Sequence, residues 1–313
     1  MDRRGFFGAV GSAAIFATTR RVYSGPSPRN SVLVERWSWA MGQPVVLRLF
    51  AESEAQGYDA AQAAFAELRR VEGHLSRFDP ASDLVALNDQ AGGRPLRVGK
   101  DLATVLTAAE AFRRGTAGAF DPAIEPVMRA WGFHAARTEG PTGVELEEAR
   151  AAVSAARVSI SGDRVGLSGR AVALDLGGIG VGYGLDRAGA TLRGHGIRAA
   201  LLNVSGDCLA IGAPPGERGW RIELADPSRP GYVVGTVHLR DSALATSANT
   251  VSVLQWRGRV VGHVMDPRTG GPAGRVRQVS VEAPSGLLAD AWSTALLVAP
   301  LPLPRRCRAH VIA

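Results

Sequence analysis

A glycine-rich stretch near the middle of the chain, Val172 to Asp186 (VALDLGGIGVGYGLD), constrains the fold more than any other segment. Five of its residues between positions 177 and 184 are glycines. Glycine permits positive φ and the close approach of a ligand or another backbone, so this density of glycines indicates a tight turn. The apolar residues before the turn predict a short buried strand over Val172 to Leu176, and a helix is expected over Tyr183 to Arg193.

A strand, a glycine turn and a helix start together predict an anion site, because free N–H groups point outward at a helix N-terminus. The G-x-G-x-G-x-G spacing differs from the dinucleotide fingerprint, and no acidic residue stands about 20 positions further on in a second strand. No Gly-Lys-Ser/Thr follows, which excludes a P-loop. On the glycines alone, a phosphate-binding turn and an ordinary tight connection in an α/β domain both stay open.

The remaining patterns predict one compact unit. Helical spacing recurs over Ala55 to Leu75, Asp101 to Arg114 and Leu287 to Leu297, whereas strands dominate the second half of the chain. Trp37 to Phe50 reads as one strand, and a βαβ unit is expected around the glycine turn. A length of 313 residues with 46% hydrophobic residues is sufficient for a sizeable core. We therefore expect a mixed α/β (α+β) fold over residues 31–313.

The net charge of +7 is carried almost wholly by arginine, since Lys100 is the only lysine. The arginines are scattered along the chain, which argues against a nucleic-acid groove. A basic surface still attracts phosphorylated ligands over a long range. The two cysteines, Cys208 and Cys307, cannot build a tetrathiolate zinc site, and whether they pair is left open.

The N-terminus predicts export. Arg3 and Arg4 precede Phe6, Phe7 and a small, apolar run, an order that is typical of a twin-arginine signal. The run is too short to span a membrane as a helix. We expect residues 1–30 to be an export signal and the rest of the chain to lie on the periplasmic or cell-envelope side.

The last predicted helix carries Asp290 and Thr294, which are four residues apart and therefore share one face. A carboxylate among apolar residues needs a partner. A carboxylate with a hydroxyl suits a hard cation such as Mg²⁺. The alternative is an exposed aspartate beside a threonine that bonds to its own helical turn.

His263 stands three residues before Asp266, in a segment that ends in the turn signal Asp266-Pro267. A neutral imidazole is a suitable proton acceptor near pH 7. A lone histidine at a strand end also serves as a structural hydrogen-bond donor, and both roles stay open. Asp121, which precedes Pro122, has the same ambiguity.

Eight short motifs occur in one order along the chain and together resemble the ApbE family. They are Met41-Gly42, SRFDPASDLVALN, GAFDP, DLGGIGVGYGLDRA, NVSGD, ATSAN, HVMDPRTG and ADAWSTAL. The resemblance covers about residues 35–300. It implies an ApbE-like, T-fold-like single unit, with a cleft for FAD between a helical lobe and a strand-rich lobe.

The resemblance also implies an enzyme, an FAD:protein FMN transferase. Such an enzyme uses Mg²⁺ to transfer FMN from FAD to a Thr or Ser hydroxyl of an acceptor flavoprotein and releases AMP. The acceptor would be an exported or membrane-bound electron-transfer protein. Two other activities stay open, namely Mg²⁺-dependent hydrolysis of FAD to FMN and AMP, and non-catalytic carriage of FAD. A monomer and a homodimer are both compatible with the resemblance.

The family's functional residues map onto matching positions of this chain. The implied metal ligands are Asp290, Thr294, the carbonyl of Gly180 and the hydroxyl of Ser293. His263 and Asp290 take the catalytic positions. The implied FAD contacts are Met41, Phe78, Ala119, Phe120, Asp121, Gly177, Tyr183, His263 and Val264.

The chain departs from the family motifs at several positions near these residues. Gln43 follows Met41-Gly42, Val181 replaces a charged residue, and the usual Gly-Gly-Asp-Ile and Ser-Gly-Asp read Ser205–Cys208 and Ser247–Asn249. None of these departures removes an implied metal ligand.

Overall fold

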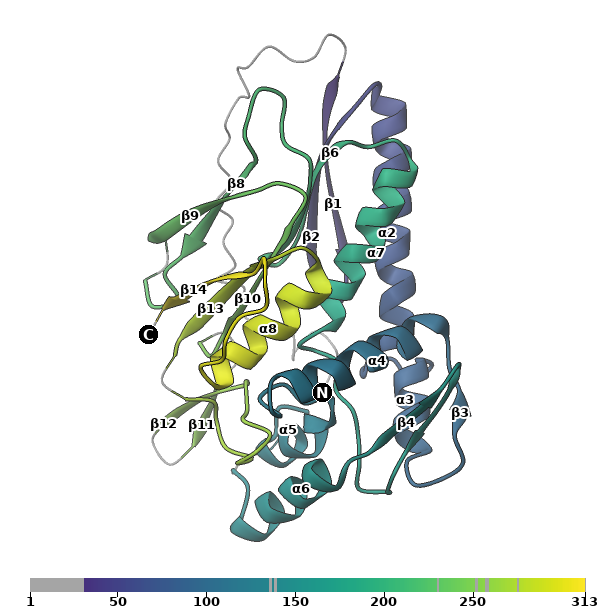
Figure 1. Cartoon of the computed structure of the whole chain (residues 1–313), viewed down its shortest axis with the longest axis vertical. Helices are drawn as coiled ribbons and strands as arrows, with labels where there is room; N and C mark the ends of the chain where they lie inside the picture. The colour runs from purple at the N-terminus through teal and green to yellow at the C-terminus, as the bar shows by residue number, and fades with distance from the viewer. Residues whose placement is uncertain are drawn as a thin grey trace.

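A computed structural model describes residues 31–134, 137, 140–229, 231–250, 253–256, 259–274 and 276–312. A strand-rich lobe and a second lobe of short helices share two long helices, α2 (Glu54–Leu75) and α7 (Gly180–Gly194), which run side by side (Figure 1). The predicted export signal, residues 1–30, lies outside the described residues. Over the described ranges, no helix is both long enough and apolar enough to cross a membrane.

The strand-rich lobe is built on a seven-stranded sheet in which every neighbouring pair is antiparallel. Its strands, in spatial order, are β1 (Val32–Ala40), β2 (Gln43–Ala51), β6 (Ala199–Val204), β7 (Asp207–Ile211), β10 (Ala243–Ala248), β13 (Gln278–Ala283) and β14 (Arg308–Ile312). The mixed α and β composition is confirmed. The predicted single strand over Trp37 to Phe50 is wrong, because Met41 (φ 57°) and Gly42 (φ 68°) form a two-residue hairpin turn.

The predicted βαβ unit is also wrong, because Val172 to Leu176 forms no strand, although its apolar residues are buried. Its backbone finds a side-chain partner instead of a neighbouring strand. The Asn88 amide donates to the Leu174 carbonyl (3.0 Å), and its oxygen accepts from the Leu174 N–H (2.8 Å). The Asn88 side chain, 86 residues away in the sequence, therefore makes the backbone hydrogen bonds that a neighbouring strand would otherwise have made.

The remaining strands form small sheets. A three-stranded sheet, β3-β5-β4, lies in the helical lobe, and two hairpins, β8-β9 and β11-β12, flank the main sheet. Their bounds are β3 (Leu96–Arg97), β4 (Val158–Ser161), β5 (Arg164–Leu167), β8 (Trp220–Ala225), β9 (Val233–Leu239), β11 (Val253–Trp256) and β12 (Arg259–Gly262).

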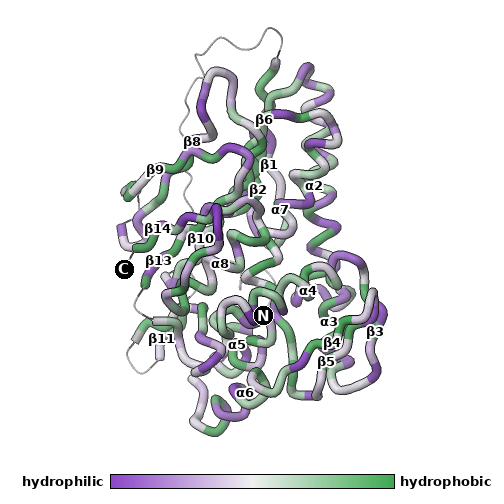
Figure 2. The backbone as a smooth tube through the Cα atoms, in the orientation of Figure 1, coloured by the Kyte–Doolittle hydropathy of each residue, from purple (hydrophilic) through white to green (hydrophobic). Residues whose placement is uncertain are grey.

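The four predicted helices are confirmed within a few residues at each end, as α2, α4 (Lys100–Gly115), α7 and α8 (Gly286–Val298). The other described helices are α3 (Asp83–Asp89), a 3₁₀ turn η1 (Pro122–Ile124), α5 (Glu125–Trp131) and α6 (Gly143–Ala155). Hydrophilic and hydrophobic residues alternate along α2 (Figure 2), as expected for a helix with one buried face.

Each lobe has its own hydrophobic core, and α7 contributes to both. Leu185 and Leu192 pack under the main sheet, whereas Ile179 and Tyr183 pack in the helical lobe. Helix α8 is divided in the same way, since Trp292 lies in the first core and Ala291 in the second. The glycine turn and α8 therefore lie at the boundary between the two cores.

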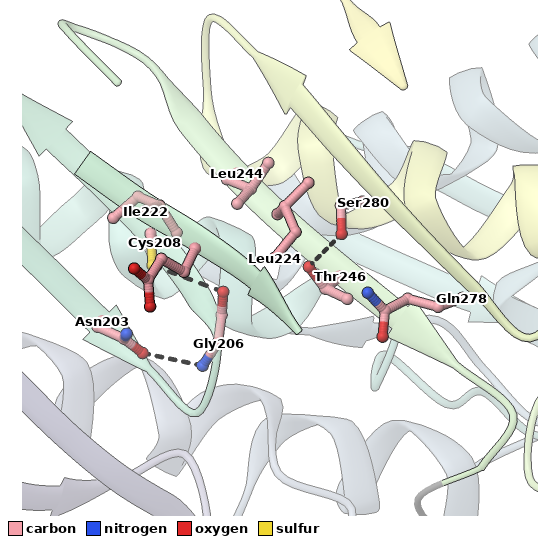
Figure 3. A pocket seen from close by; sticks show the side chains of 10 residues that line it. Asn203, Gly206, Cys208, Ile222, Leu224, Leu244, Thr246, Gln278 and Ser280 are labelled. Atoms are coloured by element: carbon pink, nitrogen blue, oxygen red, sulfur yellow. Dashed lines mark hydrogen bonds between the residues drawn. The ribbon is translucent and has the colours of Figure 1, made fainter. Parts of the chain in front are cut away.

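The other face of the main sheet is covered by the β8-β9 hairpin, which encloses a small cavity (Figure 3). The cavity is lined by Thr246 and Ser280, whose hydroxyl oxygens are hydrogen-bonded at 2.8 Å. Thr246 and the next residue, Ser247, point to opposite faces of β10, and Ser247 contacts α8. The cavity is therefore on the far side of the sheet from α8. Cys208 also lines it, and Cys208 and Cys307 are both free.

Candidate functional site

The N-terminal turns of α7 and α8 meet backbone to backbone. A Cβ on Gly182 would lie 2.2 Å from the carbonyl oxygen of Gly286, and a Cβ on Gly286 would lie 2.4 Å from the carbonyl oxygen of Gly182. Real Cβ atoms do not approach this closely, so both positions require glycine. The glycines of the central stretch therefore serve at least in part to bring two helix N-termini together.

The two helices exchange capping carboxylates. The N-cap of α7, Ile179, supplies no side-chain hydrogen bond, and the Gly182 N–H donates to Asp290 Oδ2 of α8 (2.9 Å). In return, the carboxylate of Asp186 on α7 accepts from the N–H groups of Gly286 (2.7 Å) and Leu287 (3.0 Å). Negative charge is favourable at helix N-termini. Asp186 was not among the predicted site residues, because its partners lie about 100 residues further along the chain.

Three hydroxyl groups lie beside Asp290. Ser293 Oγ donates to the Asp290 carbonyl (2.9 Å), and Ser247 Oγ of β10 is 2.7 Å from Ser293 Oγ and 3.2 Å from Thr294 Oγ1. A Cβ on Gly178 would lie 2.9 Å from Thr294 Oγ1. The glycine turn, α8 and β10 therefore converge at Thr294.

Two buried acidic groups, Asp290 and Asp207, lie close enough at this point to influence each other. Desolvation raises the pKa of the buried Asp290 well above its ordinary value, and the nearby charge of Asp207 adds to the shift. Desolvation also raises the pKa of Asp207, whose carboxylate accepts the Thr246 N–H (2.9 Å). Among the described residues, no ion pair joins either carboxylate to Arg, Lys or His.

These residues fit a magnesium ion. Mg²⁺ prefers oxygen donors, keeps few protein ligands and is commonly completed by phosphate and water. Asp290, Ser293 and Thr294 supply a carboxylate and two hydroxyls on one turn of α8. In the part of the chain that the structure describes, no group of three or more His, Cys, Asp or Glu could hold a metal alone. A cation at Asp290 would therefore depend on hydroxyl, carbonyl or phosphate oxygens.

The Met41 turn lies against the start of α7. Glu72 of α2 fixes this turn, because its carboxylate accepts from the N–H groups of Met41 and Gly42 (both 2.9 Å). A Cβ on Gly180 would lie 4.0 Å from Met41 Cε. The structure thus brings two of the predicted positions together. Glu72 was not predicted, because a helical glutamate carries no sign of a partner 30 residues earlier.

The Ala119–Asp121 segment approaches the glycine turn from the helical lobe. Phe120 is buried, and its ring lies 3.5 Å from the place that a Cβ on Gly178 would take. Asp121 accepts from the Ala123 N–H (2.9 Å), and burial raises the pKa of its carboxyl to about 6. Phe78 is 55% exposed, with the guanidinium of Arg77 4.7 Å from its ring centroid.

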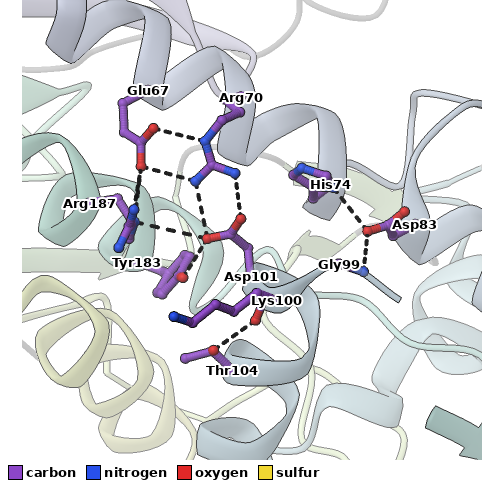
Figure 4. A network of polar contacts seen from close by, with 10 residues as sticks. All are labelled: Glu67, Arg70, His74, Asp83, Gly99, Lys100, Asp101, Thr104, Tyr183 and Arg187. Atoms are coloured by element: carbon purple, nitrogen blue, oxygen red, sulfur yellow. Dashed lines mark hydrogen bonds and ion pairs between the residues drawn. The ribbon is translucent and has the colours of Figure 1, made fainter. Parts of the chain in front are cut away.

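Tyr183 has a structural partner that the sequence did not indicate. Its hydroxyl donates to Asp101 Oδ1 of α4 (2.6 Å), and the other oxygen of this carboxylate, Oδ2, accepts from Arg70 of α2 (2.6 Å) (Figure 4). Glu67 and Arg187 complete this network. Desolvation raises the pKa of Asp101, but hydrogen bonds from Arg70 and Tyr183 outweigh it, and the pKa falls to about 2. The buried Tyr183 side chain therefore ties α7 to α2 and α4.

Strand β10 positions His263 and Val264 relative to the hydroxyl groups. The Val264 N–H donates to the side-chain oxygen of Asn249 (3.1 Å), which stands two residues after Ser247. The end of β10 and the turn that follows it therefore contact both the α8 hydroxyls, through Ser247, and the His263 segment, through Asn249. The His263 ring lies edge-on to Phe133, with ring centroids 6.4 Å apart.

Comparisons with known proteins identify the family of this chain. The sequence profile of the ApbE family matches residues 41–306. The FAD:protein FMN transferase of Rhodobacter capsulatus is 34% identical over 298 residues, which cover 93% of this chain and 55% of that protein. The protein of the same name from Treponema pallidum (strain Nichols) is 31% identical over 261 residues, which cover 78% of this chain and 72% of that protein. The chain thus spans about half the length of the Rhodobacter relative.

Solved structures show the same fold. An ApbE protein from Thermotoga maritima has a TM-score of 0.78 and 30% identity, over 85% of this chain and 87% of that chain. The flavinyl transferase ApbE from Pseudomonas stutzeri has a TM-score of 0.76 and 23% identity, over 90% of this chain and 95% of that chain. With a family match over most of its length and two relatives above 30% identity, the chain belongs to the ApbE family.

Proposed function

We propose that this chain transfers FMN from FAD to a Thr or Ser hydroxyl of an acceptor flavoprotein and releases AMP. The observation that carries the proposal is the buried Asp290, whose carboxylate accepts the Gly182 N–H of α7 and which has no basic partner among the described residues. The hydroxyl groups of Ser247, Ser293 and Thr294 contact one another on the same helix and the adjacent strand. Curated relatives named FAD:protein FMN transferase support it. The predicted cleft for FAD between the lobes is part of the same proposal.

Mg²⁺ would be held by Asp290, Thr294, the Gly180 carbonyl and the Ser293 hydroxyl. When bound there, it would neutralise the charge of the FAD diphosphate. The free N–H groups at the start of α7 would add positive potential on the same side. Met41, Phe78, Ala119, Phe120, Asp121, Gly177, Tyr183 and Val264 would form the flavin side, where Tyr183 would act through its backbone and ring edge because its hydroxyl is bonded to Asp101.

In the proposed reaction the acceptor hydroxyl attacks the phosphorus on the FMN side of the diphosphate. The new O–P bond forms as the bond to the AMP oxygen breaks, and the hydroxyl proton passes to His263. Neutral imidazole suits this role near pH 7. The products are a phosphoester-linked FMN on the acceptor and free AMP.

The test is incubation of the full chain with FAD and Mg²⁺, with and without an acceptor domain that a related transferase is able to label. We expect the acceptor to gain the mass of one FMN and AMP to appear in equal amount, both only with Mg²⁺. AMP and free FMN without labelling would instead establish hydrolysis of FAD. Bound FAD without AMP would establish a carrier.

We further propose that the protein acts outside the cytoplasm, where its acceptor would be an exported or membrane-bound electron-transfer protein. The twin-arginine order in residues 1–30 supports this location.

A further inference from the structure

Four charged side chains form a buried group beneath the flavin-side segments, which we call the charged quartet: Arg77, Glu125, His134 and Asp175. Their side chains are 17%, 8%, 7% and 11% exposed. His134 Nε2 lies 3.0 Å from Asp175 Oδ2, and His134 Nδ1 lies 3.6 Å from Glu125 Oε1. Arg77 lies 3.7 Å from Glu125 and 3.8 Å from Asp175. Arg129, 3.3 Å from Glu125, is the further charge that faces the quartet.

The geometry indicates that His134 is an imidazolium. Both of its ring nitrogens face carboxylate oxygens, and a neutral imidazole has an N–H on only one of them. Desolvation lowers the pKa of His134, but the nearby carboxylates of Asp175 and Glu125 outweigh it, and the pKa is raised. With His134 protonated, two positive charges balance two negative charges. With His134 neutral, Glu125 still faces Arg129, but the buried Asp175 keeps only the more distant Arg77, at 3.8 Å, as a cation partner among the described residues.

The quartet contacts three of the flavin-side segments, at Gly177, Pro122 and Phe78. Asp175 Oδ1 accepts from the Gly177 N–H (2.7 Å), and the Asp175 N–H donates to the Pro122 carbonyl (2.8 Å). Arg77 stacks on Phe78. The neighbour of His134, Phe133, packs edge-on against His263. A shift of Asp175 would therefore move the glycine turn and the segment after Phe120 together.

The quartet is not built for maximal stability. Three of its buried polar atoms have no hydrogen-bond partner among the described residues, namely Arg77 Nε, Glu125 Oε2 and His134 Nδ1. Buried polar groups in native proteins are usually bonded, and exceptions concentrate where function sets the geometry. Apart from the 3.0 Å contact between His134 and Asp175, the charged groups lie at long ion-pair distances. Such a group is suited to holding several segments of the chain in fixed relative positions.

We propose that His134 and its quartet partners are positioning residues for flavin binding, in which protonated His134 holds Asp175 and thereby the Gly177–Gly178 turn. The proposal rests on the proposed function, because it assigns the turn to FAD. None of the four was included among the predicted site residues. Protonated His134 would favour FAD binding, so the affinity should fall as the pH rises through the folded-state pKa of His134 and the positive charge is lost.

The test measures the Kd of the full chain for FAD, with Mg²⁺ present, by flavin fluorescence between about pH 6 and about pH 9. For the wild type we expect binding to weaken about tenfold across this range, as for the loss of one charge-assisted hydrogen bond. His134→Gln should bind FAD about tenfold more weakly at low pH, with a flattened pH profile. The matched control is His195→Gln, since His195 is exposed at the end of α7 and should leave the profile unchanged.

Asp175→Asn provides a second variant, because its amide oxygen still accepts the Gly177 N–H while the charge is lost. It should flatten the profile as His134→Gln does, and the double variant should lose no more than either single variant. FAD binding by both variants with the wild-type pH profile would overturn the quartet proposal alone. A wild type that binds no FAD at any pH would overturn both this proposal and the proposed function. If His134→Gln does not fold, the pH profile of FAD binding by Asp175→Asn alone tests the quartet proposal.

Discussion

At the scale of single residues, Asp290 combines two roles that usually conflict. It caps α7 through the Gly182 N–H, and it is a buried carboxylate with raised pKa. A folded-state pKa above the ordinary value of 3.8 means that the folded chain holds the proton more tightly than the unfolded chain. The contribution of Asp290 to stability is therefore full at low pH and is lost as the pH rises through its folded pKa. A bound cation would reverse that loss.

Asp290→Asn separates the two roles. The amide oxygen can still accept the Gly182 N–H, and no charge needs desolvation, so without Mg²⁺ the variant should be as stable as the wild type at neutral pH or more stable by about 1–3 kcal/mol. Excess Mg²⁺ should stabilise the wild type and raise its melting temperature. At a Mg²⁺ concentration of a hundred times Kd, the free energy of unfolding should increase by about 2.7 kcal/mol, whereas the variant should be unchanged. Thermal denaturation with and without Mg²⁺ measures both effects. An equal Mg²⁺ response in the two proteins would place the metal elsewhere.

The sequence also predicted the positions of some single site residues. The i, i+4 spacing of Asp290 and Thr294 predicts their common face, which α8 confirms. The partners Asp186, Glu72 and Asp101 could not be predicted, because each acts across the tertiary structure on a group far away in sequence. Nothing in a helical pattern distinguishes a solvated carboxylate from one that binds another element.

At the scale of elements, the junction of α7 and α8 depends on the absence of two side chains. Gly182 and Gly286 are in mutual contact through their backbones. The predicted N-terminus of α7 was three residues late, because the sequence shows no capping side chain and the cap comes from Asp290 of α8. The predicted strand before the turn was wrong for a related reason, since Asn88 occupies the hydrogen bonds of Leu174 that a strand would have used.

Gly182→Ala tests the junction. The new Cβ would meet the Gly286 carbonyl at 2.2 Å and Asp290 Cβ at 2.8 Å, and neither is the end of a flexible side chain. We expect a loss of about 1–3 kcal/mol, measured by urea denaturation, together with weaker Mg²⁺ binding as Asp290 is displaced. The matched control is Gly194→Ala in the last turn of α7, where no atom lies within 4 Å of the new Cβ. This change should be neutral or stabilise by up to about 1 kcal/mol. Equal effects of the two substitutions would contradict the close helix contact.

At the scale of the whole molecule, the arrangement of the lobes follows from elements that belong to both cores. Helices α7 and α8 each contribute to the core under the sheet and to the core of the helical lobe. The mixed fold and its helices could be predicted from periodicity and from the family resemblance. The strand order could not, because period-2 patterns do not say which strands pair, and the antiparallel sheet joins β2 to β6 across 147 residues of chain between Ala51 and Ala199.

Export of the whole chain is a separate prediction. A fusion of residues 1–30 to a folded reporter should be exported, and replacement of Arg3 and Arg4 by lysine should stop it, because the twin-arginine route reads the arginine pair and transports folded cargo. Periplasmic and cytoplasmic reporter levels measure the outcome. A matched replacement of Arg20 and Arg21 should leave export intact. Export that persists after the Arg3 and Arg4 change would indicate another pathway.

The exchange of carboxylates between α7 and α8 has a kinetic consequence for metal binding. Asp290 holds the Gly182 N–H with one oxygen, and this bond already fixes the carboxylate where a cation would meet its second oxygen. A cation would therefore meet a carboxylate that is already in position. The rate of loading would then be governed by the slow shedding of water from Mg²⁺ itself rather than by a motion of this carboxylate.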